Sequence, residues 1–389
     1  MEPPSTCNDD DIINDGVDKY FYMGKQKINI SSLIGQKFGS TFQLTSDKNL
    51  KLVNVFDFCN TTTKDGLNSQ EANEQKDNRF IKDDNRSQKL TRNDIEKIKK
   101  EISGEEIIKT LVENSSTFEE KNKFSQQKYL VKKKQKYLNL FTVFKPSIKL
   151  LMEMYFAKGP SKNNFLRVDT LSQMLTLCNV MAGGNYMVVD SNLGILSAGL
   201  MERTAGKGSI VQIFNETIPN GSYRQAVYAL NYPESVVSES LLSLSLNDVY
   251  ELSLEENGST CETMPTGVQK DSRQMLTKRE MRLQEVTRAK SLLRHRDMHG
   301  LLLLTKDYDP SSMIHILLQF LGLSRPFVIF SHSIDPLKEC YIQLKGKCLF
   351  LRISETWLRK YQVLEGRTRP EMTMNSSSGF VLSGIKAEI

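Results

Sequence analysis

The second half of the chain alternates short apolar runs with segments of helical character. The runs are continuous, as in YMVVD (186–190), GLLLLT (300–305) and FVIF (327–330). Continuous apolar strands separated by helices are typical of a mostly parallel sheet that is covered on both faces. This pattern predicts an α/β, doubly wound domain over residues 141–389.

The first part of the chain has a different pattern. Residues 19–58 hold short β-rich pieces such as KYFYMG (19–24) and KLVNVFDF (51–58), divided by Gly, Asn, Asp and Ser. Short strands with frequent turn residues predict a small N-terminal β-barrel or sandwich. Residues 60–88 are polar and almost without apolar side chains, which predicts a loop. We assign residues 1–88 to this β-rich domain and its loop.

Residues 89–140 have helical spacing. Thr91 stands three residues before Asp94, which is a capping pattern, and Ile95, Ile98 and Ile102 then recur at helical intervals. The segment 104–137 predicts a second helix, which begins with acidic residues and ends in lysines, as suits the helix dipole at both ends. We expect a basic helical linker between the two domains.

Residues 251–299 interrupt the α/β pattern. The stretch 251–274 is rich in Glu, Ser and Thr, and the residues up to Arg296 form a basic, helix-favouring segment. These features predict a surface insertion that ends in a charged helix. His295 and His299 are four residues apart, but no carboxylate or thiol accompanies them, so we expect no metal site.

Composition narrows the class of protein. A chain of 389 residues with 39% apolar and 25% charged residues is typical of a globular protein of two domains. Its first residues are acidic without an apolar leader, and its longest apolar runs are far shorter than a bilayer is thick, so we expect neither secretion nor a membrane span. Six scattered cysteines without a close pair predict reduced thiols in a cytosolic or nuclear protein.

Basic residues are concentrated in KYLVKKKQK (128–136), which holds five lysines and Tyr129. The net charge of +6 weakly favours an anionic partner. Most lysine runs are solvated helix faces. Here an apolar segment follows directly and holds the run beside a folded region, so phosphate binding is an equally strong interpretation.

The stretch MVVDSNLGILSAGLMER (187–203) runs from an apolar strand into an acid, a glycine turn and a helix-like segment. It is similar to the cofactor turn of S-adenosylmethionine-dependent methyltransferases, which has the order acid-x-Gly-x-Gly-x-Gly. In this chain the corresponding residues are Asp190, Asn192, Gly194 and Leu196, so the first and third glycines are missing. Leu196 would place a branched side chain where a cofactor should lie.

Two further positions depart from that pattern. Phe214 stands where an acid should bind the ribose hydroxyls, with Glu216 two residues later. SLSLNDV, which we assign to the end of the fourth strand, offers two serines and only Asp248 as an acid. We therefore expect a fold that is kept and a cofactor site that is lost, although the three acids leave an unorthodox site open. The chain shows neither a phosphate-binding loop motif nor a nucleophile-and-base constellation.

Several long motifs resemble one family. SQKLTRNDI (87–95), RVDTLSQMLTLCNVMAGG (167–184), SRPFVIFSHSIDPLKECY (324–341) and LRISETWLRKYQVLEGRTRPEMTMNSSSGFVLSG (351–384) are similar to the non-catalytic, RNA-binding subunits of the eukaryotic tRNA adenine-58 N1-methyltransferase. The resemblance runs from about residue 28 to 386 and weakens near 251–299.

The resemblance implies a β-rich N-terminal domain and a Rossmann-like, methyltransferase-type domain without catalytic or cofactor-binding residues. It implies a homologous catalytic subunit that binds S-adenosylmethionine, a heterotetramer of two plus two subunits, and methylation of the T-loop adenine of tRNA in the nucleus. Two other classes stay open from the residues alone: an active S-adenosylmethionine-dependent RNA methyltransferase, and a scaffold that contacts no RNA.

The resemblance also implies which residues contact RNA. They are Lys128, Lys132, Lys133, Lys134 and Lys136 in the basic run, Arg359, Arg367 and Arg369 after SETW, and Arg79 and Arg86 in the polar loop. A purely structural interpretation is open as well, since Arg359 stands near Trp357 and Tyr361 and an arginine commonly packs on an aromatic face.

Overall fold

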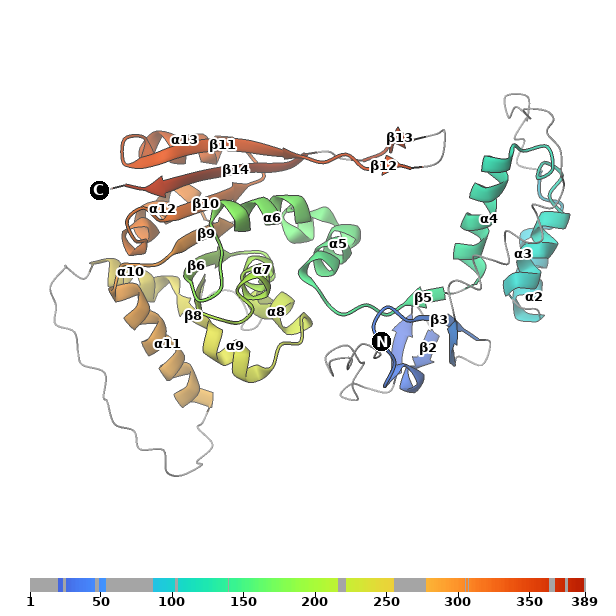
Figure 1. Cartoon of the computed structure of the whole chain (residues 1–389), viewed down its shortest axis with the longest axis horizontal. Coiled ribbons are helices and arrows are strands. Elements are labelled where there is room, and N and C mark those ends of the chain that lie inside the picture. Colours follow the sequence, from blue (N-terminus) through green and yellow to red (C-terminus); the bar gives the residue numbers. More distant parts are fainter. Residues whose placement is uncertain are drawn as a thin grey trace, which may run out of the picture. The chain divides into compact units, whose positions relative to one another are not determined.

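The computed structural model divides the chain into two compact units, Met1–Lys145 and Pro146–Ile389 (Figure 1). It describes residues 20–23, 26–45, 49–53, 87–101, 104–138, 140–215, 222–254, 278–304, 306, 308–363, 368–374 and 377–387. No helix within these ranges combines the length and the apolar character that a membrane crossing requires.

Five short strands form the β-rich part of the N-terminal unit. β1 (Tyr20–Met23) pairs with β2 (Gln26–Asn29), and β3 (Thr41–Leu44) lies between β4 (Leu50–Val53) and β5 (Leu140–Thr142). The described strands thus make two small antiparallel sheets, and they do not close into a barrel. Because β5 pairs with β3, it belongs to this unit, although the boundary was expected after residue 140.

Three described helices form a second small core in the N-terminal unit: α2 (Arg92–Glu101), α3 (Gly104–Glu113) and α4 (Lys123–Tyr137). The prediction of one helix over 104–137 was wrong, because the chain leaves the helix after Glu113 and Asn122 caps a new one. The predicted cap of α2 is confirmed, because the backbone amide of Asp94 donates to Thr91 Oγ1 (3.3 Å) and the amide of Thr91 donates to Asp94 Oδ2 (3.1 Å). Leu111 of α3 and Tyr137 of α4 are both buried in the apolar core between these helices. Apolar packing therefore fixes which face of α4 points inward.

The C-terminal unit contains a seven-stranded sheet in the order β11-β14-β10-β9-β6-β7-β8. The five strands from β10 to β8 are parallel, and β14 is antiparallel to both of its neighbours. The prediction of a doubly wound, Rossmann-like α/β domain is confirmed. The strands are β6 (Asn185–Asp190), β7 (Ser209–Phe214), β8 (Leu241–Ser245), β9 (Gly300–Leu304), β10 (Pro326–Ser331), β11 (Cys348–Trp357) and β14 (Ser377–Lys386).

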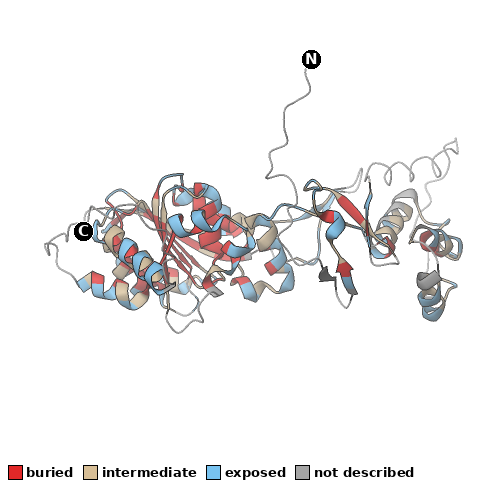
Figure 2. Ribbon diagram, turned by 90° about the horizontal axis from the view of Figure 1, so that it is seen from below, coloured by how far each residue is buried: buried red, intermediate tan, exposed pale blue. Residues whose placement is uncertain are grey.

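Helices cover both faces of this sheet, and the strands between them are the most buried part of the unit (Figure 2). Met187 and Val189 of β6 belong to one apolar core and Val188 to the other, so both faces of the strand are packed. The helices are α5 (Ile148–Lys158), α6 (Val168–Leu177), α7 (Ile195–Thr204), α8 (Gln225–Ala229), α9 (Glu234–Ser240), α10 (Leu246–Leu254), α11 (Lys278–Arg294), α12 (Pro310–Leu317) and α13 (Asp335–Leu344), with short 3-10 turns η4 (Pro160–Asn163), η5 (Ser222–Arg224) and η6 (Leu318–Phe320).

The expected surface insertion over 251–299 is wrong for its helical part. α11 packs on the sheet with Ala289 and Leu293 fully buried, and it leads the chain from β8 back to β9 (Figure 1). Its apolar stripe is narrow among many charges, which is why the sequence resembles a solvated helix. α11 ends at Arg294, so the two histidines do not share its surface, and His299 Nδ1 accepts a bond from the amide of Asn185 (3.0 Å).

β11 and β14 run on beyond the sheet as a two-stranded ribbon (Figure 1). The chain between them forms a small antiparallel pair, β12 (Tyr361–Gln362) and β13 (Arg369–Pro370). We call the described residues 358–363 and 368–374 the excursion.

Candidate functional site

Asp190, the last residue of β6, holds the turn that the sequence marks as a cofactor site. Its carboxylate accepts hydrogen bonds from the backbone amides of Asn192 (2.8 Å), Leu196 (2.7 Å) and Ser197 (3.2 Å). Burial raises the pKa of Asp190 to about 6, although the three amide bonds act in the opposite direction. Asp190 therefore caps the beginning of α7 from inside the protein, and both carboxylate oxygens are bound to its own chain.

The segment after β7 lies directly against the glycine turn. Gly194 has a φ of +80°, and a Cβ at this position would collide with the backbone carbonyl of Tyr223. The amide of Ala226 donates to the carbonyl of Leu193 (2.9 Å), which fixes the segment in place. The ring of Tyr223 stacks on Phe214 with centroids 4.7 Å apart. Phe214, at the position expected for the ribose acid, thus supports the residue that covers the turn.

The described residues at this end of the strands line a small cavity. This cavity of ≈ 10 Å³, lined among others by Asp190, Phe214 and Tyr308, lies where β6 and β7 end. Such a volume holds about one water molecule. Leu196 is fully buried in the core beneath it. Among these described residues, neither the full set of turn glycines nor an acid in the place of Phe214 is present, which are the two features of an S-adenosylmethionine site that the sequence pattern requires.

The residues of SLSLNDV have structural partners. β8 is the third parallel strand along the chain and β9 the fourth, so the assignment of this motif to the fourth strand was wrong. The amide of Ser243 donates to Glu285 Oε1 (2.6 Å), and Glu285 also pairs with Arg224. Asp248 binds Ser245 Oγ (2.6 Å) and Lys290 Nζ (2.5 Å), which caps α10 and ties it to α11. Glu216, Thr305 and Asp307 lie outside the described residues.

The five lysines of the basic run occupy different positions on α4. Lys128, Lys132 and Lys136 are exposed and four residues apart, so they follow one face of the helix. Lys133 is half-buried, with Nζ 5.1 Å from the centre of the Tyr129 ring, and burial lowers its pKa, with Lys136 and Lys121 acting in the same direction. Lys134 is also half-buried. The outward face is the part of the run that can reach phosphates.

Two of the predicted arginines lie in the excursion. Arg359 is half-buried between β11 and β12, and Arg369 is exposed in β13 opposite Gln362. Trp357 and Tyr361 beside them are 65% and 53% exposed. Two cations and two aromatic rings therefore lie in the excursion or directly before it. Arg79, Arg86 and Arg367 lie outside the described residues.

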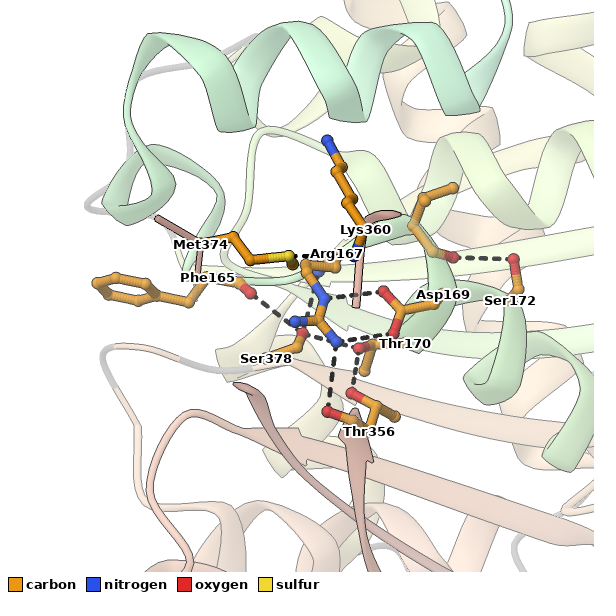
Figure 3. Close-up of polar contacts among 10 residues, drawn as sticks. Phe165, Arg167, Asp169, Thr170, Ser172, Thr356, Lys360, Met374 and Ser378 are labelled. Atoms are coloured by element: carbon orange, nitrogen blue, oxygen red, sulfur yellow. Dashed lines mark hydrogen bonds and ion pairs between the residues drawn. The ribbon is translucent and has the colours of Figure 1, made fainter. Parts of the chain in front are cut away.

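A buried polar network, not identified from the sequence, holds the root of the excursion (Figure 3). Arg167 forms a bidentate pair with Asp169, both bonds being 2.9 Å, and also donates to the carbonyl of Thr356 (3.3 Å). The hydroxyl of Thr170 bonds to those of Thr356 (2.6 Å) and Ser378 (2.7 Å).

The network joins the beginning of α6 to β11 and β14 where they leave the sheet (Figure 3). The only signal in the sequence was an arginine, an acid and a threonine at a helix start, RVDT (167–170), which is too common a pattern to identify a site.

Comparisons with known proteins agree with this geometry. The sequence profile of the Gcd10p family matches residues 17–279. A Mus musculus protein named tRNA (adenine(58)-N(1))-methyltransferase non-catalytic subunit is 34% identical, with 92% of this chain and 82% of that protein covered. A Dictyostelium discoideum protein of the same name is 31% identical, with 94% and 74% covered.

Among solved structures, tRNA (m1A58) methyltransferase TrmI from Aquifex aeolicus has a TM-score of 0.44 and 12% identity, with 64% of this chain and 80% of that chain covered. The family match spans more than half of the chain, and the mouse relative matches nearly all of it. The chain belongs to the Gcd10p family.

Proposed function

We propose that this chain is the non-catalytic, tRNA-binding subunit of a tRNA (adenine-58-N1)-methyltransferase. The observation that supports the proposal is the packed turn: the backbone of Tyr223 lies against Gly194 and its ring stacks on Phe214, in a chain that matches relatives named non-catalytic subunits along almost its whole length. A partner must then supply the cofactor and the catalytic groups.

We assign no catalytic and no cofactor-binding residue to this chain. Both carboxylate oxygens of Asp190 accept hydrogen bonds from backbone amides of its own turn, and Phe214 has no oxygen that could accept a bond from a ribose hydroxyl. S-adenosylmethionine is accordingly bound by the catalytic subunit. The alternative, an active methyltransferase, would require a cofactor to displace the Tyr223 segment and to bind without a ribose acceptor.

This chain contributes tRNA binding to the complex. The outward lysines of α4 and the two arginines of the excursion offer positive charge on ordered elements, and phosphate contacts of this kind set affinity and position without reading bases. By resemblance to the family, the assembly contains two copies of each subunit and works in the nucleus.

The test is co-expression with a catalytic subunit, followed by a mass measurement and a methylation assay on a tRNA transcript. We expect a mass of two plus two subunits, and methylation only when both subunits are present. A transcript with guanosine at position 58 serves as the control. A chain that stays monomeric beside the catalytic subunit, or that methylates tRNA alone, would contradict the proposal.

A further inference from the structure

A cleft of ≈ 1100 Å³ opens on the C-terminal unit, lined by α12, η6, the end of α13 and the ends of α11 and β14. We call it the α12–α13 cleft. It shares no lining residue with the filled cofactor turn or with the excursion.

Positive charge dominates its walls. Arg296, Lys347, Lys386 and His315 line the cleft, and its described lining contains no Asp or Glu. Lys386 Nζ donates to the carbonyl of Leu321 (2.6 Å). Arg296 and Lys386 line the same cleft, and burial lowers the pKa of Lys386, with the like charge of Arg296 acting in the same direction. An anionic ligand would relieve this repulsion.

The apolar part of the cleft is aliphatic. Leu321 and Leu344 are buried in its floor, and Leu323 is 60% exposed at its rim. The described lining residues include no Phe, Tyr or Trp, and His315 carries the one aromatic ring among them. Proteins bind unpaired bases largely by stacking them on aromatic rings, whereas peptide grooves take aliphatic anchors. The combination of cations with an aliphatic floor therefore favours an acidic peptide over RNA.

We propose that the α12–α13 cleft binds an acidic segment of the catalytic subunit, with an aliphatic side chain against the half-buried Ile316 and the exposed Leu323 and carboxylates at Lys347 and Arg296. This rests on the proposed function, which supplies the partner. The cleft then stabilises the complex, and the contribution of Lys347 weakens with salt because this side chain is exposed.

The test compares two charge reversals in the full chain. Lys347 and Lys345 are both exposed and two residues apart, but only Lys347 lines the cleft. Lys347→Glu should weaken the affinity for the purified catalytic subunit by about tenfold or more at low salt, as expected for one rim contact turned repulsive. Lys345→Glu should change it less than about twofold. Leu323→Ala should weaken assembly at low and high salt alike, because its contact is apolar.

Three results would overturn the proposal. One is equal assembly by the native chain and Lys347→Glu. Another is unchanged assembly combined with weaker tRNA binding, which would assign the cleft to RNA. The third is a native chain that does not bind the catalytic subunit at all; this contradicts the proposed function itself and is recognised before any variant is made.

Discussion

Removing the outward lysines of α4 should change the salt dependence of tRNA binding. The perturbation is the triple variant Lys128→Ala, Lys132→Ala and Lys136→Ala, three exposed side chains of α4. Lys136 also has its Nζ 5.6 Å from the centre of the Tyr137 ring, so the free energy of unfolding of the variant is measured beside its RNA affinity. The matched control is the triple alanine variant of Lys158, Lys207 and Lys345, three exposed lysines of the C-terminal unit. Both variants lose the same charge.

The magnitude follows from counterion release. Each lysine that neutralises a phosphate adds about 0.7 to 0.9 to the slope of log affinity against log salt, so three contacts account for about 2 to 3 units. Between 50 and 200 mM salt, the native complex should then lose about 30-fold more affinity than the α4 variant. Lys133→Ala should behave differently, costing the N-terminal unit about 1 kcal/mol through its lost ring contacts.

The assay is a filter-binding titration of the assembled complex at four salt concentrations. We expect a flatter slope for the α4 variant, the native slope for the control, and unchanged assembly for both. A native slope for the α4 variant would refute phosphate contact by this helix and would leave Arg359 and Arg369 as the main described candidates. Equal flattening in both variants would show a general effect of net charge.

Three further predictions concern the C-terminal unit. The pKa of Asp190 is about 6 in the folded protein and 3.8 ordinarily, so the folded state takes up a proton at a higher pH than the unfolded state does. In urea unfolding, the free energy of unfolding of the native chain should therefore rise by about 1 to 2 kcal/mol relative to that of Asp190→Asn when the pH falls from 7 to 5. An equal pH dependence of the two free energies would contradict this. The double variant Asn192→Gly, Leu196→Gly should lose about 4 kcal/mol of the free energy of unfolding, because both side chains are buried. It should give no saturable heat with S-adenosylmethionine in calorimetry, since the Tyr223 backbone still lies against Gly194. Measurable binding would contradict this. Arg167→Met should lose about 2 to 3 kcal/mol of the free energy of unfolding, because Asp169 loses its buried partner. Proteolysis within the excursion should become faster, and an unchanged rate of proteolysis would show that the network does not hold the excursion.

The sheet was predictable because burial on both faces leaves continuous apolar runs, and those runs are plain in β6, β9 and β10. The position of α11 was not. A helix that covers the edge of a sheet needs only a narrow apolar stripe, and Ala289 and Leu293 are easily overlooked among many charges. Likewise β5 is three residues long, and its membership of the first sheet depends on a pairing with β3 from a hundred residues earlier.

The loss of the cofactor site stays a prediction from residue types, since a phenylalanine cannot accept a hydrogen bond from a ribose. The expected position of Leu196 in the space of a cofactor was wrong, because its side chain is fully buried in the core beneath α7. What fills the turn could not be predicted. Tyr223 lies in a segment without a motif, and only the fold brings it against Gly194. The lysine run was also correctly located on a helix, but its division into outward and half-buried side chains depends on which face of α4 packs against α3.

The claim that this chain has filled its own cofactor site is tested most directly by counting bound S-adenosylmethionine. Equilibrium dialysis with radiolabelled cofactor should give none on the isolated full chain. The assembled complex should bind one molecule for each pair of unlike subunits. Saturable binding to the isolated chain, or two molecules for each pair, would contradict the account.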